Sequence, residues 1–168
     1  IKDRSFLAIN NLNLTIDNGS FTAVVGKSGC GKTTLLRLLC GLEEKTAGDI
    51  NFTNGPEWPP ASSPRVGIVF QEPRLMPWLT VKDNVAFSLT GVQKKNSAEW
   101  VNKFLNMVGL AQFKDAYPTQ ISGGMAQRVA LGRTLCFDPD LILMDEPFGA
   151  LDYFTRKNLQ NEMVNLFL

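Results

Sequence analysis

Histidine does not occur among the 168 residues of this chain. Histidine supplies the base of a serine–histidine triad, is the commonest metal ligand and titrates near neutral pH. Its absence therefore excludes these three kinds of site. Cysteine is scarce as well: Cys30, Cys40 and Cys136 are odd in number and lack the paired spacing of a metal site, so we expect reduced thiols in a cytosolic protein.

An excess of charge and a long apolar run are also missing. Seventeen Lys and Arg residues stand against sixteen Asp and Glu residues, which leaves a formal net charge of +1. This balance gives no overall field that would draw the protein onto nucleic acid or anionic lipid. No segment reaches the ~18 apolar residues of a membrane-spanning helix, and the first residues do not resemble a signal peptide. Because the chain starts at Ile1 rather than at methionine, we expect a fragment of a longer protein.

What is present is the composition of a globular domain. Hydrophobic residues make up 44% of the chain and charged residues 20%. Such a composition excludes a disordered or collagen-like chain, and the length fits the range of about 100–200 residues for one domain. We therefore expect a single domain over residues 1–168.

The first part of the chain has the pattern of strand, turn, strand, loop and helix. Apolar and polar residues alternate imperfectly over residues 8–17, and Asn18-Gly19 follows, which is a strong signal for an antiparallel hairpin with residues 20–25 as its second arm. Residues 34–40 are apolar around most of a helical circumference and stop at a glycine, which is favourable at a helix end. We predict a β hairpin followed by a buried helix.

The rest of the chain alternates strands with helices. Prolines over residues 53–64 predict a surface excursion between two short strands, at 48–52 and 65–70. The periodicity then predicts helices over 80–89, 97–108 and 122–137, a buried strand over 141–144 and an amphipathic helix over 152–167. This order predicts an α/β fold with a helical insertion.

Residues 26–33 form a glycine-rich motif between a predicted strand and a predicted helix. Its three glycines let the backbone curl so that successive N–H groups and the helix N-terminus hold phosphate oxygens. Lys32 would reach the β- and γ-phosphates of a nucleotide, and the Thr33 hydroxyl would bind Mg²⁺. A glycine-rich connector with no ligand is the alternative, but the flanking strand and helix favour a phosphate site.

Two carboxylates, Asp145 and Glu146, directly follow the strand predicted at 141–144. Open α/β sheets bind ligands at the carboxyl ends of their strands. Asp145 would hold Mg²⁺ through water, and Glu146 could polarise an attacking water. An acidic pair at a strand end can also be a solvated turn or a helix cap, but phosphoryl transfer requires a metal carboxylate in addition to a phosphate loop.

The tripeptide Ser122-Gly123-Gly124 precedes a predicted helix, and Ser122 is a suitable N-cap. Capping alone does not explain the glycines, because each weakens a helix by about 1 kcal/mol relative to alanine. Unobstructed backbone N–H groups at a helix start are suited to a second phosphate contact. Two chains arranged head to tail would sandwich one ATP between this surface and the glycine-rich loop.

Taken together, these residues resemble the ATP-binding cassette (ABC) ATPases over essentially the whole chain. Five motifs occur in the family's order: a Walker A loop at 26–33, a Q-loop at 69–71, a signature at 121–127, a Walker B strand at 141–146 and a D-loop at 149–152. The resemblance implies a P-loop NTPase with a RecA-like core, an N-terminal antiparallel β hairpin and an inserted helical subdomain at about residues 72–120. Segments 73–78, 83–87 and 146–156 are similar to the nitrate, sulfonate and taurine importer ATPases, and 35–50 to the aliphatic sulfonate branch.

The resemblance implies ATP and Mg²⁺ as cofactors and ATP hydrolysis as the activity. Gln71 and Glu146 would be the catalytic pair that acts on the lytic water, and Thr33, Gln71 and Asp145 would bind the metal. Asp152 would organise the dimer interface. The residues expected to contact nucleotide are Gly26, Lys27, Ser28, Gly29, Cys30, Gly31, Lys32, Thr33, Thr34, Ser122, Gly123, Gly124 and Asp152.

The resemblance also implies partners. In a dimer with a second ABC ATPase subunit, expected to be identical, residues 122–124 would contact the γ-phosphate bound in the opposite protomer. Residues 72–120 would dock on a transmembrane permease at the cytoplasmic face of the inner membrane, and a solute-binding protein would be engaged indirectly. ATP-driven closure of the dimer would import a small oxyanion such as sulfonate, nitrate or taurine, and no nucleic-acid partner is expected.

The sequence departs from the family pattern in some places. Phe6 is the sole candidate for the aromatic that stacks on adenine, and Ile121, Met125 and Gly132 stand where Leu, Gln and Ala are common. The switch histidine and its strand, which follow the D-loop helix in the family, are absent. We therefore expect a truncated domain whose C-terminal part is missing and whose hydrolysis is impaired.

Three alternative functions stay open. A soluble ABC ATPase acting on DNA or ribosomes would need a basic surface, and in chromosome-maintenance members a coiled coil precedes the signature, whereas this chain shows no heptads there. A P-loop kinase or GTPase would give no reason for residues 122–124. A hydrolysis-deficient nucleotide-binding fragment is the third alternative.

Overall fold

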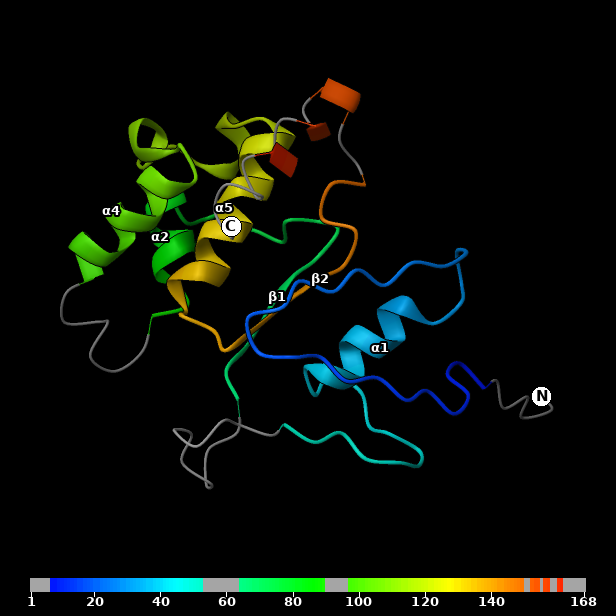
Figure 1. The fold of residues 1–168 in the computed structure, drawn as a ribbon. Coiled ribbons are helices and arrows are strands. Elements are labelled where there is room, and N and C mark those ends of the chain that lie inside the picture. Colours follow the sequence, from blue (N-terminus) through cyan, green and yellow to red (C-terminus); the bar gives the residue numbers. More distant parts are fainter. Residues whose placement is uncertain are drawn as a thin grey trace. The chain divides into compact units, whose positions relative to one another are not determined.

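The structure is a computed structural model that describes residues 7–52, 64–89, 97–149, 152–154, 156–157 and 160–161 (Figure 1). The chain divides into two compact units, Ile1–Asn51 and Phe52–Leu168. The described part of the first unit holds one helix, and that of the second holds a pair of strands with several helices. The expectation of one domain over residues 1–168 stays a prediction.

Helix α1 spans Lys32–Leu39 in the first unit and begins two residues earlier than predicted. None of its residues is fully buried, so the prediction of a buried helix is wrong. Its N-cap is Gly31, whose φ of 96° lies in the left-handed region that glycine adopts without strain. At the other end, the Gly41 N–H donates a hydrogen bond to Leu38 O at 3.1 Å. The helix therefore ends at the glycine that the sequence predicts.

The predicted hairpin is present only in part. A turn closes at the expected place, since the Ser20 N–H donates to Asp17 O at 3.1 Å and Gly19 has a φ of 71°. Residues 7–31 nevertheless contain no strand, so neither arm of the hairpin forms a ladder, and the strand predicted at 48–52 is not found either. An isolated two-stranded hairpin is marginally stable unless one face packs against something, and apolar residues of this segment such as Leu12, Phe21 and Val25 are exposed.

Two parallel strands form the sheet of the second unit: β1, Val66–Val69, and β2, Leu141–Met144. Both strands confirm the prediction. In their register Val69 pairs with Met144, so the carboxyl ends of the strands lie at the same edge. Parallel strands cannot be joined by a tight turn, and the chain between them forms helices α2, α4 and α5 (Figure 1).

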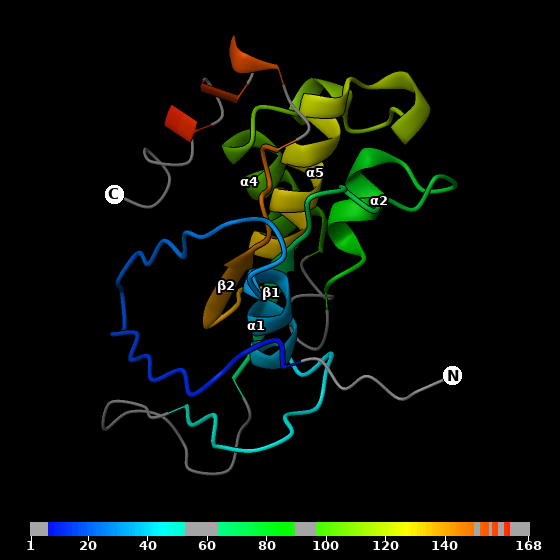
Figure 2. The same cartoon turned by 90° about the vertical axis from the view of Figure 1, so that its right-hand side faces the viewer.

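Three helices of the second unit lie between the two strands in the sequence. They are α2, Val81–Ala86, α4, Ser97–Met107, and α5, Gly123–Cys136, with 3₁₀ turns at Ala111–Phe113 and Pro118–Gln120. Helix α5 packs against α2, α4 and β1, and Figure 2 shows it between the other two helices. The three predicted helices are thus confirmed, and the first is shorter than expected. None of the helices in the described ranges combines the length and the apolarity that a bilayer crossing requires.

The hydrophobic core of the second unit gathers around α5. Leu105 of α4 and Val129 of α5 are fully shielded from solvent. The ring of Trp100 meets that of Phe104 edge-on, with centroids 5.5 Å apart. The buried members of this core are Val69, Val81, Val85, Leu89, Val101, Phe104, Leu105, Val108, Leu110, Val129, Leu131 and Cys136. This core fixes the strands that carry the candidate site.

Some expectations fall outside the described residues. These are the proposed adenine-stacking residue Phe6, residues 53–63 of the proline-rich excursion, and residues 150 and 151 of the D-loop. Most of the helix predicted at 152–167 also lies outside. Its described members, Tyr153, Phe154, Arg156, Lys157, Gln160 and Asn161, are helical.

Candidate functional site

The glycine-rich loop of the first unit curls around the side chain of Lys32. The Nζ of Lys32 donates hydrogen bonds to Gly26 O at 3.0 Å and to Lys27 O at 3.1 Å. The Cys30 N–H donates to Lys27 O at 3.2 Å and closes a turn within the loop. The loop is therefore a compact structure that carries a fixed positive charge.

Three glycines are required by this curl. Gly29 and Gly31 have φ angles of 78° and 96°, which other residues adopt only with strain. A Cβ added to Gly26 would lie 2.6 Å from Cys30 Sγ, and one added to Gly31 would lie 2.7 Å from Ala8 O. A side chain at Gly26 or Gly31 would therefore force a neighbouring atom to move, and the φ angles of Gly29 and Gly31 favour glycine. The contact of these glycines with phosphate stays a prediction.

The loop leads into the N-terminus of α1. Thr33 and Thr34 lie in the first turn of this helix, which contains no acidic residue. The N-terminal end of a helix carries a partial positive charge and directs backbone N–H groups outward. Residues 26–30 are exposed, so this charge and the Lys32 ammonium form a surface that a polyanion can reach.

The second unit places its candidate residues at the carboxyl edge of the sheet. Asp145 and Glu146 follow β2, and Gln71 follows β1. The Asp145 N–H donates to Val69 O at 2.9 Å, so the parallel pairing extends to the first residue of the acidic pair. Asp145 is half-buried, whereas Gln71 and Glu146 are exposed.

Gln71 lies against the turn that follows β2. The Gly149 N–H donates to Glu146 O at 2.9 Å, and Glu146 has a φ of 45°, which is uncommon for a residue other than glycine. A Cβ added to Gly149 would lie 3.2 Å from Gln71 Nε2 and 3.7 Å from Glu146 Cβ. The fold therefore brings the Q-loop glutamine and the Walker B glutamate to one place from positions far apart in the sequence.

The signature residues stand at the start of α5. Ser122 is the N-cap of the helix, and its Oγ accepts a hydrogen bond from the Met125 N–H at 3.3 Å, as predicted. Gly123 is exposed, and a Cβ added to it would have nothing within 4 Å, so packing does not require a glycine there. Gly124 is half-buried. At its two glycines, the first turn of α5 thus has no side chain that would block a ligand from the backbone.

Asp152 lies beyond the turn that follows β2. Its Oδ1 accepts a hydrogen bond from the Phe154 N–H at 3.1 Å. Arg156 reaches back and donates from Nε to Phe148 O at 3.1 Å and from Nη2 to Gly149 O at 3.4 Å. These bonds tie the helical segment after the D-loop to the turn that carries the Walker B glutamate.

The candidate magnesium ligands fall into two sets. Thr33 belongs to the first unit, and Gln71 and Asp145 belong to the second. Among the described residues, no three His, Cys, Asp or Glu side chains form a cluster suited to a metal. Mg²⁺ takes one or two protein oxygens and completes its shell with phosphates and water. The donors are all oxygen atoms, and the polyanion surface next to Thr33 suits the phosphates.

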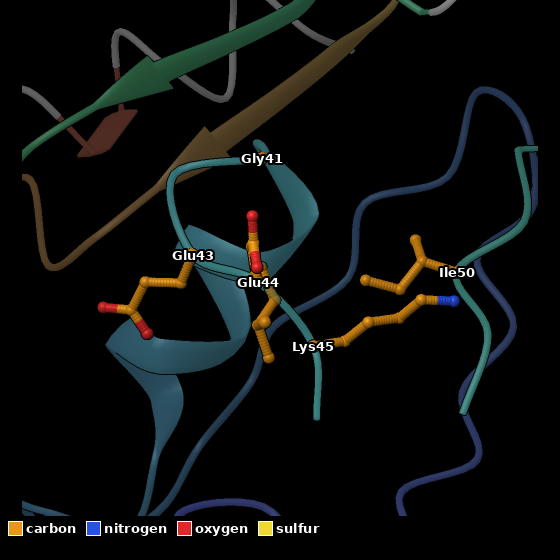
Figure 3. Close-up of a pocket in the computed structure, with 6 residues that line it drawn as sticks. Gly41, Glu43, Glu44, Lys45 and Ile50 are labelled. Atoms are coloured by element: carbon orange, nitrogen blue, oxygen red, sulfur yellow. The ribbon is translucent and has the colours of Figure 1, made fainter. Parts of the chain in front are cut away.

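A shallow hollow in the first unit lies away from the loop (Figure 3). It has a volume of about 450 Å³ and is lined by Leu38, Gly41, Glu43, Glu44, Lys45 and Ile50. It borders the C-terminal end of α1, roughly 12 Å along that helix from the glycine-rich loop. Its two glutamates oppose the binding of phosphate, and it contains no predicted nucleotide-binding residue.

Two polar residues of α5 are given no individual role by the prediction from sequence, although Gln127 is the last residue of the predicted signature. Gln127 and Arg133 donate hydrogen bonds to backbone carbonyls of the segment 70–74, next to Gln71. The signal that could have found them is their place in a helix that is buried on most sides, where a polar side chain has to find a partner.

Comparison with known proteins identifies the family. The family model described as ABC transporter matches residues 9–149. An uncharacterized ABC transporter ATP-binding protein of Methanocaldococcus jannaschii is 50% identical over 95% of this chain and 60% of the relative. The aliphatic sulfonates import ATP-binding protein SsuB of Bacillus cereus is 43% identical over 98% of this chain and 64% of the relative. The nitrate import ATP-binding protein NrtD of Synechocystis sp. is 42% identical over 99% and 62%.

The chain thus spans less than two thirds of the length of these relatives. Among solved structures, a dimeric ATP-binding cassette in a post-hydrolysis state, bound to ADP and Pi, matches with a TM-score of 0.76 and 32% identity. That match covers 95% of this chain and 75% of the other. It confirms the predicted P-loop NTPase fold. Because the family model covers most of the chain and the relatives exceed 40% identity, the chain belongs to the ABC transporter family of ATP-binding proteins.

Proposed function

We propose that this chain binds MgATP and hydrolyses it as part of an ABC importer ATPase. The observation that carries the proposal is the curled loop, in which Lys32 is held by two loop carbonyls at the start of a helix. When ATP enters, the Lys32 ammonium exchanges these carbonyls for phosphate oxygens, and the N–H groups of the loop and of the first helical turn surround the β-phosphate.

Magnesium supplies charge neutralisation for the phosphates when it is bound. The Thr33 hydroxyl and the Gln71 amide oxygen would bind the ion directly, and the Asp145 carboxylate would hold it through water. Glu146 would accept a proton from the attacking water, and Gln71 would orient that water. The geometry that supports these roles is the meeting of Gln71 with the turn at Glu146 on one edge of the sheet.

A second copy of the subunit completes the site. The first turn of α5 offers backbone N–H groups that no side chain covers at Gly123. One nucleotide does not require two phosphate cradles from one chain, so residues 122–124 would contact the γ-phosphate in the partner, and Asp152 would lie at the interface. The matched post-hydrolysis structure is described as dimeric, which supports this arrangement.

The importer would carry a small oxyanion. The relatives named as sulfonate and nitrate import proteins support a solute of this class, with taurine as a further member. Trp78 and Phe87 in the region 72–120 are 73% and 62% exposed, and they offer an apolar surface for a permease. The subunit would then lie at the cytoplasmic face of the membrane, with a solute-binding protein reached through the permease.

The first step is tested by thermal unfolding with and without MgATP. We expect nucleotide at 100 times its dissociation constant to stabilise the protein by about 2.7 kcal/mol. The Lys32→Ala variant should lose most of this gain, because the phosphates lose their cation. Lys45→Ala is the matched control, since Lys45 pairs with Asp49 outside the loop. No shift at millimolar MgATP, or an equal shift in Lys32→Ala, would refute the nucleotide site.

Hydrolysis is tested separately with Glu146→Gln. This variant keeps the size of the side chain but removes its basicity, so MgATP binding should persist while turnover falls by about 10²–10⁴-fold. Turnover at the parent rate would remove Glu146 from the mechanism while leaving the nucleotide site in place.

A further inference from the structure

The segment that follows β1 is bound to α5 at several points. The Nε2 of Gln127 donates to Phe70 O at 3.0 Å. Arg133 donates from Nη2 to Pro73 O and from Nη1 to Arg74 O, both at 3.0 Å. One helix therefore holds the backbone on both sides of the Q-loop glutamine.

One anchoring side chain, that of Gln127, is buried, and the other, that of Arg133, is half-buried. Gln127 is 4% exposed, and a buried amide that loses its partner is costly, so this bond is maintained. Burial lowers the pKa of the Arg133 guanidinium, which nevertheless stays charged and matches two successive carbonyls with its planar fork. Neither side chain is placed as a solvated surface group would be.

The held segment has a strained backbone. Arg74 has a φ of 46°, in the left-handed region that residues other than glycine rarely occupy. Its guanidinium lies over the Phe70 ring, 4.2 Å from the centroid, and its carbonyl accepts from Arg133. Such a conformation persists only where several contacts enforce it, and here α5 supplies one of them.

The same helix begins with the signature residues. Helix α5 is a single element of 14 residues with Ser122 as its N-cap, and a continuous helix transmits a displacement along its axis. A contact made at residues 122–124 therefore reaches Gln127 and Arg133 without passing through a flexible joint.

We propose that Gln127 and Arg133 are positioning residues that set Gln71 according to the state of the signature turn. The inference rests on the proposed function, because it requires Gln71 to act at the nucleotide and residues 122–124 to meet the nucleotide of the partner subunit. When residues 122–124 of one protomer contact the nucleotide of the partner subunit, the displacement passes along α5 of that protomer. It then reaches the Gln71 of the same protomer, which acts at the other nucleotide site.

The first test measures backbone protection and needs no activity. Gln127→Met preserves length and burial but removes the donor, and Arg133→Gln removes the fork. Arg65→Gln is the matched control, because Arg65 also bonds two acceptors, Asp138 and Asp140, at the opposite end of β1. Amide hydrogen exchange over residues 71–76 should rise about tenfold in the first two variants and stay unchanged in the control. Unchanged exchange in both would overturn the inference.

The second test measures ATP turnover. Gln127→Met and Arg133→Gln should each lower kcat about tenfold with KM for ATP unchanged, whereas Arg65→Gln should leave both at the parent values. In a Gln71→Ala background the same two substitutions should cause no further loss, since the residue through which they act is gone. A further loss there would show a role independent of Gln71 and would overturn the inference.

The two proposals fail in different ways. A parent protein that turns over no ATP would count against the proposed function, and the exchange experiment would still decide whether α5 holds the segment. A parent protein that is active, with Gln71→Ala impaired and Gln127→Met and Arg133→Gln unimpaired, would leave the proposed function standing and overturn the positioning role alone.

Discussion

The two compact units differ in how much they bury. In residues 7–52 no residue is fully shielded from solvent, and Phe21 and Val25 are 81% and 89% exposed. In the second unit, Leu105 and Val129 are 0% exposed at the centre of a core. The first unit nevertheless forms the curled glycine-rich loop around Lys32.

This difference separates two ways of building a site. The hydrogen bonds of the loop join residues that are close in sequence, such as Lys32 and Gly26. Forming them requires a turn and the start of a helix, but no hydrophobic core. Gln71 and Glu146 are distant in sequence and meet only because β1 pairs with β2 beneath α5. Local bonds therefore specify the curl of the glycine-rich loop, and packing specifies the sheet edge that carries Gln71 and Glu146.

The largest expected effect comes from removing a core side chain of the second unit. Leu105→Ala should lower the free energy of unfolding by about 2–5 kcal/mol, because it leaves a cavity in a site that is fully buried. The same substitution at Leu12, which is 51% exposed, should change it by less than about 0.5 kcal/mol. Urea unfolding followed by circular dichroism measures both. Equal losses would contradict the contrast between the two units.

Thiol reactivity tests the same contrast chemically. Cys30 is exposed in the loop, whereas Cys136 is buried, and burial raises the pKa of the Cys136 thiol to about 11. A higher pKa leaves less thiolate at neutral pH, so N-ethylmaleimide should modify Cys30 roughly a hundredfold faster than Cys136. Peptide mass spectrometry over time resolves the two sites.

Nucleotide adds a control to this experiment. MgATP should slow the labelling of Cys30, because the phosphates would occupy the loop, and should leave the rate at Cys136 unchanged. Rapid modification of Cys136 in the folded protein would contradict the buried core.

A smaller effect is expected where α5 approaches β1. A Cβ added to Gly67 would lie 2.6 Å from Thr134 Cγ2 and 3.2 Å from Pro139. Gly67→Ala should therefore destabilise the protein by about 1–3 kcal/mol through overpacking. Thr134→Ser removes the clashing methyl group, so the double variant should recover part of the loss. Thermal unfolding measures the three variants, and additive losses would exclude this contact as the cause.

The sequence predicts the features that local rules govern. The strand at 141–144, the N-cap at Ser122 and the helix end at Gly41 are confirmed, since each depends on residues within one turn or strand. The curl of the glycine-rich loop follows from its own glycines in the same way. The pairing of β1 with β2 places Gln71 and Glu146 at one edge, as the rule for parallel sheets implies.

The features that the sequence does not reveal are nonlocal. The alternation over residues 8–25 predicts a ladder, but a two-stranded hairpin also needs a surface to pack on, and no ladder forms in this exposed segment. The bonds of Gln127 and Arg133 to the segment after β1 depend on how α5 crosses the sheet. The sequence of α5 by itself predicts an N-cap and a helix with apolar residues. It does not predict which backbone groups the side chains of Gln127 and Arg133 bind.

The smallest effect, and the only stabilising one, is expected inside α5. Gly132 is helical and buried, and a Cβ added to it would lie 3.5 Å from Val108 and 3.6 Å from Val85, which is ordinary contact. Gly132→Ala should therefore raise the free energy of unfolding by about 0.5–1 kcal/mol, because alanine restricts the unfolded chain and fills space without strain. A gain measured by urea unfolding would show that α5 tolerates a methyl group where it faces Val85 of α2 and Val108, whereas Gly67 does not tolerate one where the same helix faces β1. A lower free energy of unfolding for Gly132→Ala would mean that α5 packs as closely against its neighbouring helices as it packs against β1.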